Sequence, residues 1–145
     1  MAALLIWISV EDFRSYEIPD PGWVLLLCGG LLYRSGSGDP LWQLALDALV
    51  WPLMIWGIVL VHAWLRGRQG FGFGDVKLLS GIGVWVGFHG VTTTLLVASF
   101  SGILAILALA SLRRQPLAEA AANVIAFGPF LCLSCWAVVL QEGRV

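Results

Sequence analysis

The chain has 145 residues, of which 59% are hydrophobic and 12% charged, and its formal net charge is −1. A soluble globule of this length cannot bury so large an apolar fraction, and the charged share is about half of what soluble proteins carry. The composition excludes a soluble enzyme, a disordered chain and a disulfide-stapled secreted domain. It predicts one all-α, polytopic membrane domain spanning residues 1–145, with the lipid bilayer as a partner. The basic residues form no stripe that would follow a phosphate backbone, so no nucleic acid is expected.

Apolar segments predict about six membrane spans in an integral helix bundle. In chain order they are Met1–Val10, Pro21–Tyr33, Leu41–Leu65, Leu78–Phe88, Val91–Leu112 and Ala122–Leu140. The charge-free run from Leu78 to Leu112 would form a helix of about 52 Å, too long for one pass through a core of about 30 Å. We therefore expect it to fold back where polarity rises, at His89-Gly90 and then Thr92-Thr93-Thr94. Met1–Val10 covers only half the core, and we interpret it as the second half of a first helix whose upstream half is absent.

The basic residues predict an orientation. If the spans alternate, one side holds six of them and the other holds Arg34 and Arg144, and the richer side is expected to be cytoplasmic. The six are Arg14, Arg66, Arg68, Lys77, Arg113 and Arg114.

Two acids are predicted to lie on the side that is richer in basic residues, although they are far apart in the chain. Asp12 and Asp75 each precede a span that is too short for the core. We expect the loops that carry them to dip below the membrane surface, which irregular backbone does only where it lines a protein cavity. Acids placed in this way are functional candidates.

The segment Gly70–Lys77 has three alternating glycines before Asp75. Such a loop permits positive φ and close backbone approach, which would suit presentation of Asp75 to an extended peptide. It lacks the Gly-Lys-Ser/Thr ending and the third glycine of nucleotide-binding loops. The spacing alone leaves open a flexible transporter loop in which Asp75 and Lys77 are merely solvated.

Three motifs together resemble a known family. Residues 71–78, FGFGDVKL, are similar to the Gly-x-Gly-Asp-x-Lys signature of the type IV prepilin peptidases of type IV pili and type II secretion systems. Residues 12–20, DFRSYEIPD, resemble the family's first aspartate segment, and residues 125–130, IAFGPF, resemble its third landmark with Ala126 in place of the usual proline. The matches occur in the family's order and cover nearly the whole chain.

The resemblance implies an aspartic endopeptidase, a GxGD-type membrane protease. It would cleave the basic leader of prepilin or prepseudopilin precursors at the cytoplasmic face of the bacterial inner membrane. Asp12 and Asp75 match the catalytic pair. Residues expected to bind substrate or support the loops are Gly72, Gly74, Lys77, Pro19, Asp20, Gly128 and Pro129.

Other properties follow from the same resemblance. No cofactor or metal is implied, and the oligomeric state stays open. The sequence holds no counterpart of the family's cytoplasmic domain with paired Cys-x-x-Cys motifs, so we expect the short form, which lacks N-methyltransferase activity. Cys132 and Cys135 fall within an apolar span and are expected to be buried small side chains.

Several alternatives remain at this stage. A small proton- or ion-conducting protein would use Asp12, Asp47 and Asp75 as a relay, and a non-catalytic assembly subunit would tolerate the loss of either motif aspartate. Lys77 would hydrogen-bond a loop carbonyl, moderate the charge of Asp75 or anchor its helix at the interface. Gly83 and Gly87 fit the small-x-x-x-small pattern of close helix packing.

Overall fold

The computed structural model describes residues 1–15, 18–66, 73–113, 127–141 and 143. This part of the chain is built from helices and contains no strand, as the all-α prediction requires. The helices are α1 (Ala2–Ser15), α2 (Asp20–Gly36), α3 (Leu41–Arg66), α4 (Phe73–Arg113) and α6 (Gly128–Gln141). Of the predicted last span, residues 122–126 lie outside the described residues, and the remainder forms α6.

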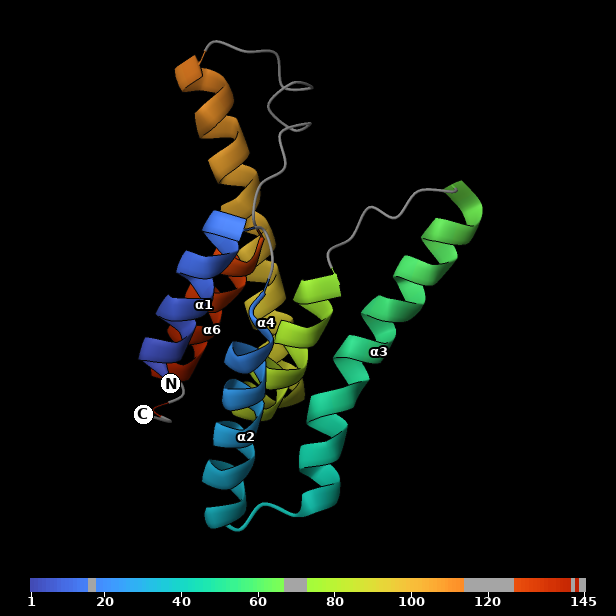
Figure 1. The fold of residues 1–145 in the computed structure, drawn as a ribbon, viewed down its shortest axis with the longest axis vertical. Helices are drawn as coiled ribbons and strands as arrows, with labels where there is room; N and C mark the ends of the chain where they lie inside the picture. The colour runs from blue at the N-terminus through green and yellow to red at the C-terminus, as the bar shows by residue number, and fades with distance from the viewer. Residues whose placement is uncertain (16–17, 67–72, 114–126, 142, 144–145) are drawn as a thin grey trace.

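Helix α4 is broken at Gly87, where φ is 70° and ψ is 177°. The break divides it into a first leg, residues 73–86, and a second leg, residues 88–113, and the chain turns back between them (Figure 1). The predicted reversal is confirmed, but its predicted position at His89-Gly90 is wrong. Positive φ with extended ψ is a conformation that essentially only glycine adopts, and Gly87 supplies it.

The helices alternate in direction along the chain, and α4 lies at the centre (Figure 1). Helix α4 packs against α2, α3 and α6, while α1 packs chiefly against α6. The end of α1 and the beginnings of α2, α4 and α6 therefore lie towards one end of the bundle. The fully buried core between these helices includes Ile8, Leu26, Leu78, Ile82 and Leu131.

Prolines mark the beginnings of two helices. Pro19 is the extended N-cap residue of α2, and a second proline follows in the first turn. Pro129 is the second residue of α6. Because the first helical turn has backbone N–H groups without intrahelical acceptors, proline fits there without the loss of a hydrogen bond.

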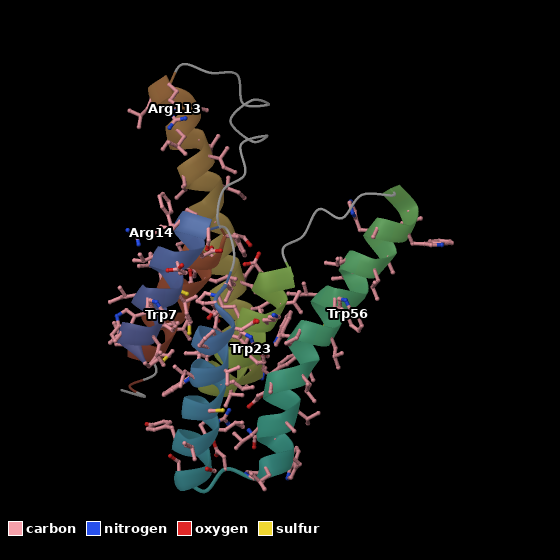
Figure 2. All side chains as sticks on the ribbon, in the orientation of Figure 1. Trp7, Arg14, Trp23, Trp56 and Arg113 are labelled. Carbon is pink, nitrogen blue, oxygen red and sulfur yellow. The ribbon has the colours of Figure 1, made fainter. Side chains whose placement is uncertain are left out.

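The outer surface of the bundle is apolar. Large hydrophobic side chains are exposed on every described helix, among them Phe13, Leu32, Trp64, Leu112 and Leu133. Two helices, Leu41–Leu65 and Gly74–Arg113, are long and apolar enough to cross a membrane by length and composition, and the latter turns back at its break. The chain is thus a helical membrane bundle. Arg14 and Arg113 lie towards the end of the bundle where α1 ends (Figure 2).

Candidate active site

Asp12 lies inside α1, with only 6% of the residue exposed. Its carboxyl group is packed against the backbone of Gly128, the first residue of α6. A Cβ atom added to Gly128 would stand 2.9 Å from the Asp12 Cγ and closer still to Oδ2. The contact therefore requires glycine at position 128, and it brings the first and third sequence motifs together.

One oxygen of this buried carboxyl group has no partner. Asp12 Oδ2 is enclosed, yet among the described residues it accepts no hydrogen bond. Buried polar atoms are nearly always satisfied, because an unsatisfied one carries the full cost of its desolvation. Such an oxygen is typical of a group that is held ready for a ligand or a reaction.

Asp75 lies in the first turn of α4 and is partly buried. Asp12 and Asp75 lie close enough for their charges to interact, although 63 residues separate them in the sequence. Gly74 contributes to this arrangement, because a Cβ atom there would lie only 3.2 Å from the Ile18 side chain. Ile18 follows α1, so this contact holds the beginning of α4 close to the segment after Asp12.

Both acids belong to helices, which corrects the prediction that loops carry them. Helix α1 continues through Asp12 to Ser15, and α4 already begins at Phe73. In α1 the polar side chains of Ser9 and Ser15 bond carbonyls one turn earlier, so they extend the helix without interrupting it. The expectation for Gly70 and Gly72 concerns residues outside those that the structure describes.

Lys77 bonds to Asp20, an interaction that was not among its three predicted roles. Its Nζ donates to Asp20 Oδ1 at 2.6 Å, which connects the first leg of α4 to the beginning of α2. This hydrogen bond, with a weaker one from the indole of Trp23, lowers the pKa of the exposed Asp20 carboxyl group. The charge of Asp20 therefore has a cationic partner on the protein itself.

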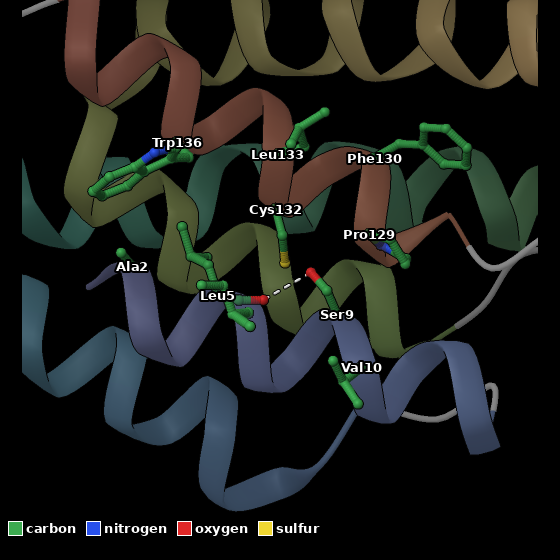
Figure 3. Close-up of a pocket in the computed structure, with 10 residues that line it drawn as sticks. Ala2, Leu5, Ser9, Val10, Pro129, Phe130, Cys132, Leu133 and Trp136 are labelled. Atoms are coloured by element: carbon green, nitrogen blue, oxygen red, sulfur yellow. Dashed lines mark hydrogen bonds between the residues drawn. The ribbon is translucent and has the colours of Figure 1, made fainter.

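A cavity of about 410 Å³ opens between α1 and α6, and neither Asp12 nor Asp75 is among the described residues that line it. Figure 3 shows Cys132 of α6 pointing towards α1 near Ser9, with Val10 and Pro129 at the same end of the cavity. Cys132 is within electrostatic reach of both Asp12 and Asp75. The sequence predicted its burial correctly, but no motif indicated that it or Ser9 borders the acids.

Asp47 lies at the other end of the bundle and is also buried. Its Oδ2 accepts a hydrogen bond of 2.6 Å from Arg34, and its Oδ1 accepts one of 3.0 Å from the amide of Phe88. Arg34 was predicted to follow the span Pro21–Tyr33 in an outer loop, but α2 runs to Gly36, and Arg34 belongs to this helix and is only 6% exposed. Because Asp47 is engaged in this pair, it offers no support to the proposed three-acid relay.

Comparison with known proteins identifies relatives of the whole chain. The model of the type IV leader peptidase family matches residues 1–107. A prepilin leader peptidase/N-methyltransferase of Aeromonas salmonicida (strain A449) is 32% identical over 144 residues, which cover 96% of this chain and 48% of the relative. The protein of the same name from Stutzerimonas stutzeri is 33% identical over 151 residues, 98% of this chain and 50% of the relative.

A third relative of that name, from Dickeya chrysanthemi, is 32% identical over 132 residues, 90% of this chain and 45% of the relative. The chain thus spans about half the length of the curated relatives that it matches. No solved structure matches the chain.

Proposed function

The chain belongs to the type IV leader peptidase family, and from this membership we propose that it is an aspartic endopeptidase that removes leaders from prepilin-like precursors. The observation that carries the proposal is the junction of two distant carboxyl groups, Asp12 and Asp75, at one end of the bundle. The first of them is buried with an unpartnered oxygen. The proposal concerns the peptidase activity alone.

The chemistry assigned to this pair is hydrolysis of a peptide bond. Two carboxyl groups in one site do not both ionise easily, so they share a proton. The ionised group takes a proton from water as the water attacks the scissile carbonyl, and the protonated group donates a hydrogen bond to the carbonyl oxygen. The proton then passes to the leaving amine. Because the pair titrates as a unit, these roles belong to the pair.

The proposed substrates are prepilin or pseudopilin precursors, by analogy with the names of the relatives. We place the chain in the bacterial inner membrane with the acid pair towards the cytoplasm. The excess of basic residues on the predicted side supports this orientation, because cytoplasmic loops are enriched in lysine and arginine. Arg14 and Lys77 belong to that set, and each lies near one of the two acids in the sequence.

The test is leader cleavage of a prepilin-like substrate in membranes that contain the parent chain, Asp12→Asn or Asp75→Asn at matched protein levels. Each substitution nearly preserves the side-chain shape while it removes an ionisable group. We expect each to lower cleavage by at least about 10³-fold, as is usual when an essential catalytic group is lost. The matched control is Asp39→Asn, an acid outside this site that pairs with Arg34.

Cleavage that persists in either site variant would refute the two-aspartate mechanism. Equal loss in Asp39→Asn would show that any change of an acid disables the chain, and would also refute the assignment.

A further inference from the structure

The break in α4 separates backbone groups from their helical partners, among them the N–H of Phe88 and the carbonyl of Val84. In a continuous helix the N–H of Phe88 would donate to the carbonyl of Val84, four residues earlier. The conformation of Gly87 turns the peptide between them out of the helix. In a membrane protein a broken helix persists only where the freed backbone groups find new hydrogen-bond partners.

A buried ion pair supplies both partners. The Phe88 amide donates to Asp47 Oδ1 at 3.0 Å, and Arg34 Nη1 donates to the Val84 carbonyl at 3.1 Å. The same Nη1 donates to Asp47 Oδ2 at 2.6 Å. The pair therefore takes the place of the helix hydrogen bond between Phe88 and Val84: the Asp47 carboxylate accepts from the freed N–H, and the Arg34 guanidinium donates to the freed carbonyl.

Neighbouring contacts fix the same turn. Gly83 lies so close to the backbone of α3 that an added Cβ atom would collide with the carbonyl oxygen of Asp47. Trp51, one turn further along α3, donates its indole N–H to the Phe88 carbonyl at 3.0 Å and stacks on the Phe88 ring. The first leg of α4 is thus held against α3 by both the backbone and the side chain of Asp47.

The first leg transmits this constraint to the acid pair. It runs from residue 73 to 86 as one helix, so it is about 20 Å long and carries Asp75 at the end opposite the break. At the Asp75 end, the leg makes an exposed ion pair between Lys77 and Asp20. Exposed ion pairs contribute little to stability, whereas the loss of a partner from a buried pair is strongly disruptive.

We propose that Arg34 and Asp47 are positioning residues, which replace the Phe88–Val84 hydrogen bond lost at Gly87 and thereby hold the leg that carries Asp75 in place against α2 and α3. The position of the leg does not depend on the proposed peptidase activity. Only its catalytic consequence rests on that function, so the test measures position.

The experiment uses a disulfide as a position sensor. The Cβ of Ile18 stands 3.4 Å from the position that a Cβ on Gly74 would occupy, close to the separation in a disulfide. The full chain with Ile18→Cys, Gly74→Cys and the exposed Cys28 replaced by serine is oxidised mildly in membranes. The rate of cross-linking is read by mass spectrometry of the linked peptide. This reporter chain is the parent for all further variants.

The proposal predicts a specific order of rates. Asp47→Leu removes the acceptor for the Phe88 amide and lowers the cross-linking rate at least about fivefold, because a shift of a few ångströms takes two Cβ atoms out of bonding range. Asp47→Asn keeps an acceptor oxygen and stays within about twofold of the parent. Asp39→Asn is the matched control, since Asp39 also pairs with Arg34 but bonds neither group at the break, and it retains the parental rate.

The charge-swapped double variant Arg34→Asp with Asp47→Arg is decisive. It restores opposite charges, but it puts a donor opposite the Phe88 amide and an acceptor opposite the Val84 carbonyl. We expect a rate as low as that of Asp47→Leu. Recovery in the swapped chain would show that charge attraction alone suffices and would overturn the proposal. A parental cross-linking rate in Asp47→Leu would also overturn the proposal, as would a rate in Asp47→Asn as low as that in Asp47→Leu.

Discussion

The contact between Gly128 and Asp12 gives the sharpest test of the site geometry. In Gly128→Ala the new methyl group would lie 2.9 Å from Asp12 Cγ, whereas ordinary contacts begin at 3.4 Å. Either the carboxyl group or the beginning of α6 must therefore move by at least about half an ångström, which is the tolerance within which reacting groups are held. A displacement of about 1 Å lowers turnover by about 10²-fold. We expect a fall in kcat of one to two orders of magnitude.

The assay is steady-state leader cleavage with purified chain in detergent micelles, with kcat and KM determined separately. KM should change little, because the methyl group disturbs the reacting acid. Gly102→Ala is the matched control, since the nearest atom to its Cβ would be 3.9 Å away on Phe127. A normal kcat in a folded Gly128→Ala chain would refute the inference that the Asp12 carboxyl group acts from its position against α6.

Three further changes test the packing and the charges. Gly83→Ala forces a methyl group against the α3 backbone, so it should lower the free energy of unfolding in detergent by about 1–3 kcal/mol and reduce the melting temperature. Gly57→Ala is the control, because a Cβ atom there meets nothing within 4 Å and should leave the melting temperature unchanged. Gly87→Ala places a side chain at a φ of 70° and should destabilise by about 1–3 kcal/mol. Lys77→Met removes the bond that lowers the pKa of Asp20, so its stability should fall below the parent's above pH 4 and converge with it as acid protonates Asp20. Equal stability of each variant and its parent across these conditions would contradict the corresponding contact.

The sequence predicted that α4 turns back, but it did not predict the residue at which the turn occurs. The length of the charge-free run required a turn, because a single helix would exceed the membrane core. Rising polarity pointed to the wrong residues, since Thr92 and Thr93 bond carbonyls one turn earlier and stay helical. The turn occurs at Gly87, where a backbone conformation that only glycine tolerates is stabilised by side chains from two other helices. Local polarity carries no information about such tertiary partners.

The prediction of Asp12 and Asp75 as a catalytic pair has a different basis. Both lie within motifs whose order and spacing resemble those of a family, so they could be named without knowledge of the packing, and their catalytic role stays a prediction. Arg34 and Cys132 have no motif, and their positions depend on contacts between helices that are distant in the sequence. The helical setting of both acids was missed because the motifs contain glycine, proline and several polar residues, which are typical of loops.

Hydrogen bonding distinguishes the two buried acids, which look alike in the sequence. Asp47 accepts hydrogen bonds from Arg34 and from the Phe88 amide, so both of its carboxylate oxygens have protein partners at the break of α4. Asp12 is equally buried, yet its Oδ2 accepts no hydrogen bond from the described residues. The Asp47 carboxyl group is satisfied by protein groups, whereas the Asp12 carboxyl group has a backbone partner at Gly128 but leaves Oδ2 for a ligand or reactant to satisfy. The structure thus supports a structural role for the acid at one end of the first leg and a chemical role for the acids at the other.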